Sequence, residues 1–372
     1  MMVPTGDLLL KREGNKSTAI TMRDVAAASG FSSATVSIVL NNAPLARYIA
    51  PATKKRIEEA AKKLGYRPNA MARFLRSKRS HSIGVMFFDI TDPYCMPVLR
   101  GIENALYQSS YVPIFADAHN QKIRFERYLE MLLEHHVEAL IVVANWLLVD
   151  IHLLADVSKR NIPAATICWE IEGDTVSSVM VDNEMGGRLA LEHLYQLGHR
   201  KIAFIRGPKM IIDSGPRWKG IQKFAQSVKL EIDPALIAQL NDSFDPNSGF
   251  EGGYRFTEEL LHKKKRFTAL LAFDDLTALG AIRALTKAGI KVPEQCSVVG
   301  FDDVPLSSLA APSLTTIRQP LEAMGGTAVQ MVMDSINAGL EKRDWTSSRQ
   351  RMTPELVIRD STRAASQTGA DD

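Results

Sequence analysis

Beyond residue 80, short apolar runs alternate along the chain with stretches whose apolar residues recur at helical spacing. The apolar runs predict buried strands at residues 82–88, 112–117, 139–144, 163–168, 201–207, 268–273 and 297–302. The helical spacing predicts helices over residues 94–107, 124–135, 149–159, 183–198, 218–228, 249–261 and 276–288. Such alternation is typical of an α/β fold with doubly wound parallel sheets. Because these strands are too many for one compact sheet, we expect two lobes with a ligand between them, at the carboxyl ends of the strands.

The first 80 residues follow a different pattern, with short helices separated by tight turns. Thr21 and Asp24 suit the capping of a first helix that begins at Met22. Gly30 provides a turn, and Ser32 suits the cap of a second helix. Two short helices joined by such a turn predict a helix-turn-helix, whose second helix enters the major groove of DNA. A third helix, over residues 51–64, completes a small core.

Residues 67–80 form a short basic segment after the third helix. Its helical stretch is too short to be stable alone, so we expect it to fold on DNA or to be an ordinary linker. Leu75 is the apolar side chain best placed to wedge between base steps in the minor groove.

Charge supports this division. Residues 1–80 hold 15 Lys/Arg and 5 Asp/Glu, a balance of +10, whereas residues 81–372 hold 30 and 37, a balance of −7. A basic head on an acidic body indicates a polyanion-binding module. Three scattered cysteines, no secretory signal and no apolar run of bilayer length indicate a cytoplasmic, nucleoid-associated protein with no membrane partner.

Several ordered motifs resemble the LacI/GalR family of bacterial transcription regulators. They are TMRDVAAASGFSSATVSIVLN, TKKRIEEAAKKLGYRPNAMARFLRS, SIGVMF, LALEHLYQLGHRKIAFIRGP, GFDDV and SLTTIRQP. The resemblance extends from about residue 20 to about residue 360. It implies a homodimer on a near-palindromic operator and a sensor of periplasmic-binding-protein fold. A tetramer is not expected, because the tail lacks a leucine heptad.

The resemblance also implies which residues contact DNA. Ile38 stands where the family often carries arginine, and the loop after Asn41 is a few residues longer than in the lac repressor, so the operator sequence cannot be copied from a relative. The implied DNA-binding residues are Thr21, Ser32, Ser33, Ala34, Thr35, Ser37, Asn41, Asn69, Ala72, Leu75 and Arg76.

Strand ends and the resemblance together nominate effector-binding residues. Arg217 and Asp302 are the strongest candidates, since a guanidinium donates in pairs and a carboxylate accepts from hydroxyl groups. Cys168 stands where many relatives carry a sugar-binding aspartate. Trp146 and Trp169 would cover a ring face or simply pack in the core. The full set is Asp92, Tyr94, Trp146, Cys168, Trp169, Arg217, Asp274 and Asp302, with Asp89, Pro93, Asn145 and Phe273 as further strand-end candidates.

The expected domains follow from these patterns. They are an arm (1–19), the helix-turn-helix domain (20–66), a hinge (67–80), the effector and dimerisation domain (81–363) and a tail (364–372). Lobe 1 should hold about 81–179 and 319–342, and lobe 2 about 180–315 and 350–361. The chain should cross between lobes near Val179–Asp182, Leu314–Gln319 and Arg343–Arg351.

An enzyme is not expected. The pairs Asp274–Asp275 and Asp302–Asp303 should diverge to opposite faces, and His135–His136 lacks a third metal ligand. We expect no cofactor and no metal. The sequence therefore predicts a DNA-binding regulator, in the family's default role of repressor, controlled by a sugar or sugar derivative. Open alternatives are a co-repressor-dependent regulator that senses a purine or nucleoside-like metabolite, a solute-binding protein, and a constitutive architectural DNA binder.

Overall fold

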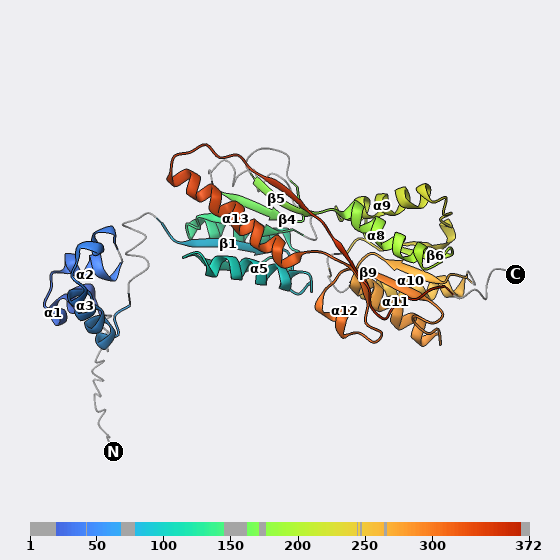
Figure 1. Ribbon diagram of the computed structural model, residues 1–372, viewed down its shortest axis with the longest axis horizontal. Helices are drawn as coiled ribbons and strands as arrows, with labels where there is room; N and C mark the ends of the chain where they lie inside the picture. The colour runs from blue at the N-terminus through green and yellow to red at the C-terminus, as the bar shows by residue number, and fades with distance from the viewer. Residues whose placement is uncertain are drawn as a thin grey trace, which may run out of the picture. The chain divides into compact units, whose positions relative to one another are not determined.

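A computed structural model describes residues 20–41, 43–67, 79–144, 162–170, 176–243, 245, 248–263 and 266–365 (Figure 1). The chain separates into two units, Met1–Ser80 and His81–Asp372. The predicted helix over residues 149–159 lies outside the described residues.

The N-terminal unit is a small helical domain. Its elements are α1 (Met22–Ser29), α2 (Ser33–Leu40), the 3-10 helix η1 (Pro44–Tyr48) and α3 (Pro51–Leu64). Val25, Val36 and Ile57, one from each α-helix, are fully buried at its centre. Gly30 ends α1 in the left-handed conformation at φ 75°, which glycine adopts without the strain that a Cβ atom would cause. The predicted helix-turn-helix is therefore present, while η1 was not predicted.

The C-terminal unit contains two six-stranded sheets. The first has the order β11-β5-β4-β3-β1-β2, and every strand pair in it is parallel. Its strands are β1 (Ser82–Phe87), β2 (Val112–Asp117), β3 (Ala139–Val143), β4 (Ala164–Ile167), β5 (Val176–Val181) and β11 (Arg349–Met352). Helices α5 (Cys95–Tyr107) and α13 (Leu321–Leu340) pack on one face, and α6 (Lys122–Glu134) packs on the other.

The second sheet has the order β12-β10-β9-β8-β6-β7, with β12 antiparallel to β10 and the other pairs parallel. Its strands are β6 (Ile202–Arg206), β7 (Ile237–Gln239), β8 (Ala269–Ala272), β9 (Ser297–Asp302), β10 (Thr315–Arg318) and β12 (Glu355–Val357). Helices α8 (Asn183–Gln196) and α9 (Ser214–Ser227) cover one face, and α10 (Ser248–His262) and α11 (Asp275–Lys287) cover the other. Short elements η2 (Pro234–Leu236) and α12 (Pro305–Leu309) complete this lobe.

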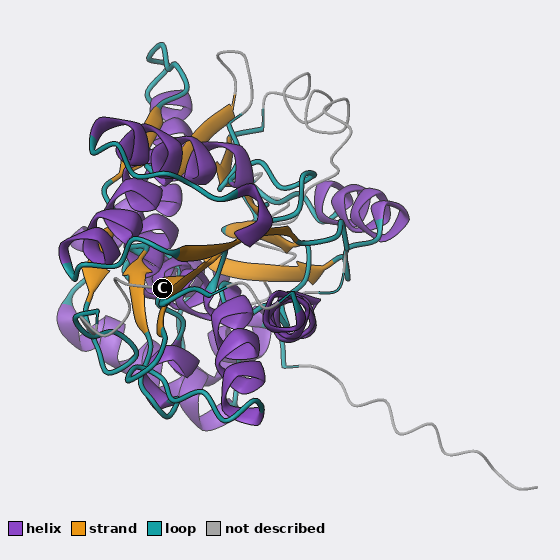
Figure 2. Cartoon of the chain, turned by 90° about the vertical axis from the view of Figure 1, so that its right-hand side faces the viewer, coloured by secondary structure: helices purple, strands orange, loops and turns teal. Residues whose placement is uncertain are grey.

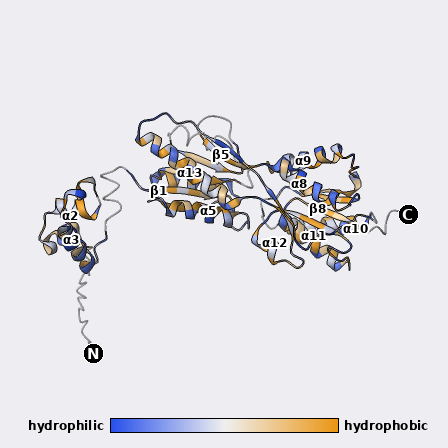
Figure 3. Ribbon diagram, viewed as in Figure 1, coloured by the Kyte–Doolittle hydropathy of each residue, from blue (hydrophilic) through white to orange (hydrophobic). Residues whose placement is uncertain are grey.

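Helices and strands form the layers that the alternating pattern predicts. Figure 2 shows strands between helices, and in Figure 3 the helices carry hydrophobic and polar stripes. Within β1, Ile83, Val85 and Phe87 face the α5 side, whereas Met86 faces the α6 side. Both faces of the strand are thus buried, as in other doubly wound sheets.

The chain passes three times between the lobes, and the third passage differs from our expectation. We expected residues from about 350 to lie in lobe 2, but Arg349–Met352 pairs with β5 in lobe 1. The passage therefore lies between Met352 and Glu355 rather than near Arg343–Arg351. The strand is largely exposed at the edge of its sheet, so it needs no apolar residues and leaves no apolar run in the sequence.

Candidate functional site

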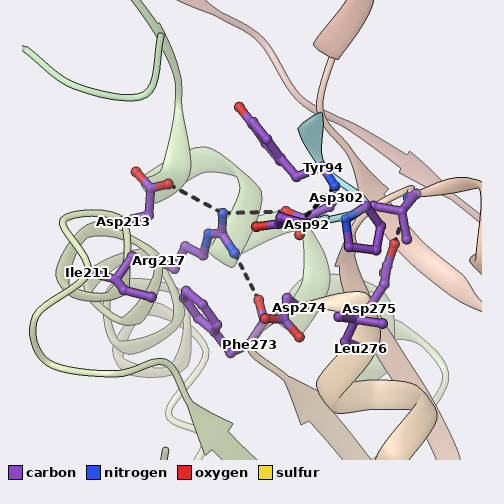
Figure 4. A pocket seen from close by; sticks show the side chains of 12 residues that line it. Asp92, Tyr94, Ile211, Asp213, Arg217, Phe273, Asp274, Asp275, Leu276 and Asp302 are labelled. Atoms are coloured by element: carbon purple, nitrogen blue, oxygen red, sulfur yellow. Dashed lines mark hydrogen bonds and ion pairs between the residues drawn. The ribbon is translucent and has the colours of Figure 1, made fainter. Parts of the chain in front are cut away.

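A pocket opens at the carboxyl ends of parallel strands from both lobes (Figure 4). It encloses about 520 Å³ of space not occupied by atoms, including the part open to solvent. Lobe 1 contributes the loop after β1, and lobe 2 contributes the start of α9 and the loops after β8 and β9. The lining residues are Asp92, Pro93, Tyr94, Ile211, Asp213, Arg217, Phe273, Asp274, Asp275, Leu276, Asp302 and Val304.

Arg217 is the centre of this pocket and is 7% exposed. Its Nε donates to Asn183 Oδ1 (2.8 Å), and its Nη1 donates to the Phe273 carbonyl oxygen (2.9 Å). Its Nη2 lies 3.6 Å from Asp213 Oδ2 and 3.5 Å from Asp302 Oδ1. The guanidinium is thus held in one plane, with its last nitrogen between two carboxylates.

Aromatic rings hold the same guanidinium from its faces. Its central carbon lies 3.7 Å from the centre of the Phe301 ring and 4.6 Å from that of Phe273. Such cation–π contacts strengthen when water is excluded. A pre-positioned guanidinium beside carboxylates can donate to and accept from the hydroxyl groups of one small molecule.

Burial raises the pKa of the Asp213, Asp274 and Asp302 carboxyls, although the Arg217 charge opposes the rise in each. Burial also raises the pKa of Asp275 to about 7. Asp275 is structural as well: it accepts from the Val304 amide (2.9 Å) and from two buried hydroxyl groups.

Tyr94 and Cys168 join two strand ends of lobe 1. The Tyr94 hydroxyl and the Cys168 thiol form a hydrogen bond, and both side chains are buried. Burial raises the pKa of both groups. Cys168, predicted as a ligand contact, stands behind Tyr94 rather than among the lining residues.

Five of the predicted effector residues meet in the pocket. They are Asp92, Tyr94, Arg217, Asp274 and Asp302. Trp169 is elsewhere: it is buried in the cluster beneath α6 that contains Phe88 and Phe125. Trp146 and Asn145 lie outside the described residues.

Asp213 and Asn183 were missed by sequence reasoning. Asn183 Nδ2 donates to Asp213 Oδ1 (2.6 Å), and both residues contact Arg217. The spacing of Asp213 and Arg217, four residues apart, is the one signal that could have linked them. Asn183 comes from the start of α8, which only the tertiary fold brings to this place.

The candidate DNA-contacting residues lie at the start of α2. Ser33 and Ala34 are exposed, while Thr35 and Ser37 are half-buried. Ser32 Oγ accepts from the Thr35 amide (3.1 Å) and so caps the helix. At the first helix, the Thr21 amide and hydroxyl both donate to the Asp24 carboxylate (2.8 and 2.7 Å), and these bonds lower the pKa of Asp24.

Asn41 closes α2, with its Nδ2 donating to the Ser37 carbonyl oxygen (2.8 Å). The longer loop that follows contains η1, where Leu45 and Tyr48 are exposed and the Arg47 guanidinium lies over the Tyr48 ring. Outside the described residues lie Asn69, Ala72, Leu75 and Arg76.

Comparison with known proteins agrees with this architecture. "Bacterial regulatory proteins, lacI family" matches residues 21–69, and "Periplasmic binding protein-like domain" matches residues 191–362. The chain is 33% identical to the HTH-type transcriptional repressor PurR of Haemophilus influenzae (strain PittEE) over 350 residues, covering 92% of this chain and 99% of the relative. PurR of Aliivibrio fischeri (strain MJ11) is 31% identical, covering 92% and 98%.

Solved structures of transcription regulators are also similar to this chain. The lac repressor bound to ONPG is similar with a TM-score of 0.78 and 28% identity, covering 92% of this chain and 99% of that one. A complex of the regulator CelR with cellobiose has a TM-score of 0.67 and 27% identity, covering 92% and 99%. The chain therefore belongs to the LacI family. It is a DNA-binding transcriptional regulator whose second domain binds a small-molecule effector. In the part of the chain that the structure describes, no helix is long and apolar enough to cross a membrane.

Proposed function

We propose that this regulator is a homodimeric repressor that binds a near-palindromic operator and responds to a polyhydroxylated effector, a sugar or sugar derivative, in the pocket around Arg217. The observation that carries the proposal is the guanidinium held between Asp213 and Asp302 at the interlobe strand ends. Adjacent sugar hydroxyls are matched by this pairing of donor and acceptors. The lac repressor, whose dimer is solved on operator DNA, and CelR support it as similar regulators. Because such a repressor acts on chromosomal DNA, we propose that the protein works in the cytoplasm, at the nucleoid.

The pocket is tied to a lobe crossing through Gln319. Gln319 Nε2 donates to Asp302 Oδ1 (2.6 Å), and Gln319 lies between β10 and α13, where the chain passes to lobe 1. An effector that engages Asp302 competes for this bond. Effector binding would thereby bias the relative position of the lobes. The effector can shift the equilibrium between two lobe positions only by the difference between its binding free energies for them.

A purine or nucleoside-like co-repressor is the second candidate. The relatives named PurR and the Phe273 ring in the pocket wall favour it. The two candidates differ in the sign of the change in operator affinity that they cause. A sugar acting as inducer lowers this affinity, whereas a purine acting as co-repressor raises it.

Selection of genomic fragments on the purified protein tests the function. We expect enrichment of a two-fold symmetric motif, and the salt concentration must be stated because phosphate contacts make affinity salt-dependent. Sugars and purines are then added to the enriched DNA complex. Fragments without a shared motif, in the presence and absence of these candidates, would contradict the proposal.

A further inference from the structure

Arg206 is a half-buried cation that the effector site described above does not use. It ends β6, and its guanidinium carbon lies 4.6 Å from the centre of the Trp218 ring. Its Nε is buried and has no hydrogen-bond partner. Among the residues that the structure describes, none forms an ion pair or hydrogen bond with this guanidinium.

The other partly buried arginines of this lobe are paired. Arg217 lies beside Asp213 and Asp302, and Arg359 Nη2 lies 2.6 Å from Asp303 Oδ1. Among the described residues, Arg206 has only the Trp218 ring as an interaction partner for its charge. Burial lowers the pKa of Arg206, but a guanidinium keeps its proton in proteins, so the charge remains without a counter-charge from the described part of the chain. A buried donor without an acceptor destabilises the fold, and more so when it is charged.

Arg206 lines a second cavity that adjoins the effector pocket. The cavity comprises about 360 Å³ of space not occupied by atoms, including the part open to solvent, and Arg217 and Phe273 line both cavities. Its other walls are mostly apolar and include the rings of Phe204, Trp218 and Phe301. Both β6 and α9, which supply Arg206 and Trp218, belong to lobe 2 (Figure 1).

We propose that Arg206, backed by Trp218, is an anion subsite that receives a phosphate or carboxylate group of the effector. This inference rests on the proposed function and names the effector class more narrowly: a hydroxylated molecule with one anionic oxygen group. Its hydroxyls meet Asp213, Arg217 and Asp302, and its anionic group forms charge-assisted hydrogen bonds with Arg206. The aromatic walls contact the part of the effector between these groups.

Inorganic phosphate and acetate test the subsite without knowledge of the effector. Each is titrated into the full-length protein at constant ionic strength with chloride, and binding is followed by 31P line broadening or calorimetry. We expect phosphate, acetate or both to bind the wild type. Binding of phosphate alone indicates a phosphorylated effector, and binding of acetate alone indicates a sugar acid. Binding of neither overturns the proposal.

Three variants locate the binding. Arg206→Gln should weaken binding at least tenfold, and Arg206→Lys, which keeps the charge without the planar fork, should lie between Gln and wild type. Arg188→Gln is the matched control, since Arg188 is an arginine of the same lobe that is exposed and paired with Glu192. Equal binding to Arg206→Gln and the wild type, or equal weakening by Arg188→Gln, overturns the proposal. If Arg206→Gln does not fold, the anion affinities of Arg206→Lys and Arg188→Gln are compared instead. Weaker binding to Arg206→Lys supports the subsite, and equal binding overturns it.

Operator binding by the same variants separates this inference from the proposed function. A symmetric operator that Arg206→Gln still binds, together with undiminished phosphate binding, overturns the subsite alone. Absence of operator binding by the wild type contradicts the proposed function, whatever phosphate does.

Discussion

Arg217 holds together the buried polar cluster at the proposed effector site. Two carboxylates, an amide and a carbonyl converge on it, so its removal leaves buried Asp213 and Asp302 without their counter-charge. Breaking a buried pair in this way typically costs about 3–5 kcal/mol.

We therefore expect Arg217→Met to abolish effector binding and to lower the melting temperature. Thermal unfolding and calorimetric titration of the identified effector measure the two effects. The expected operator affinity of the folded variant is that of wild type, because the helix-turn-helix residues are unchanged. Arg188→Gln again serves as control and should change neither quantity. Wild-type effector affinity in Arg217→Met would contradict the role given to the guanidinium.

Asp275 makes stability depend on pH. Its pKa in the folded protein is about 7, above the ordinary value of 3.8, so the folded state binds the proton more tightly than the unfolded state. The resulting stabilisation is complete below pH 3.8 and is lost as pH rises toward 7. One such group contributes a slope of at most about 1.4 kcal/mol per pH unit. The raised pKa of Asp213, Asp274 and Asp302 acts in the same direction.

We expect Asp275→Asn to flatten this slope, since an amide does not titrate but can still accept from the Val304 amide. Unfolding free energies by denaturant at pH 5, 6 and 7 provide the measurement. A slope equal to that of wild type over this range would show that Asp275 does not titrate there.

At the scale of elements, the cap of α2 stabilises the helix end that we propose to contact DNA. Ser32 Oγ accepts from the Thr35 amide, and loss of such a cap costs about 1 kcal/mol. Aspartate is as good an N-cap as serine, but its charge repels DNA phosphate.

We expect Ser32→Ala to speed hydrogen exchange of the amides in the first turn of α2, and Ser32→Asp to keep wild-type protection. Operator affinity should fall in both, and more in Ser32→Asp. Exchange by mass spectrometry and fluorescence anisotropy of labelled operator measure these effects. Full operator affinity in Ser32→Asp would place this helix end away from phosphate.

The contact of α5 with α13 depends on glycine at specific positions. A Cβ atom at Gly325 would lie 2.3 Å from the Val98 carbonyl oxygen, whereas one at Gly326 would have its nearest neighbour at 3.9 Å. We expect Gly325→Ala to destabilise the protein by about 1–3 kcal/mol, because the two helices must separate. Gly326→Ala should be neutral or stabilising by up to about 1 kcal/mol, since alanine favours helix. Denaturant unfolding of both variants compares them, and equal effects would contradict the close approach.

At the scale of the whole molecule, one of the three crossings between lobes is linked to the pocket through the hydrogen bond from Gln319 to Asp302. We expect Gln319→Leu to retain effector binding but to reduce the change in operator affinity that the effector causes, because the link from Asp302 to the crossing is lost. Operator titrations with and without saturating effector measure that coupling. An unchanged ratio of the two affinities would show that another crossing carries the response.

Much of this organisation could be predicted from the sequence because it rests on local patterns. Helical and strand periodicities placed most helices and strands within a few residues, and Gly30 and Ser32 marked the turn and the cap. The resemblance to relatives nominated Arg217 and Asp302. Strands β5, β7 and β10 to β12 were not predicted. The edge strands β7, β11 and β12 bury few side chains and leave little apolar periodicity, whereas β5 and β10 are buried but contain serine or threonine among their apolar residues.

The sequence by itself determined a helix-turn-helix head, an α/β body with parallel sheets and the strand ends at which we propose that a ligand binds, because hydrophobic spacing and capping residues act over a few neighbours. Only the tertiary structure decided that Asn183 and Asp213 complete the shell of Arg217, that Trp169 turns into the core and that Arg206 has no acidic partner among the described residues. These facts depend on how residues far apart in the chain meet, which is set by strand order, sheet faces and the three crossings.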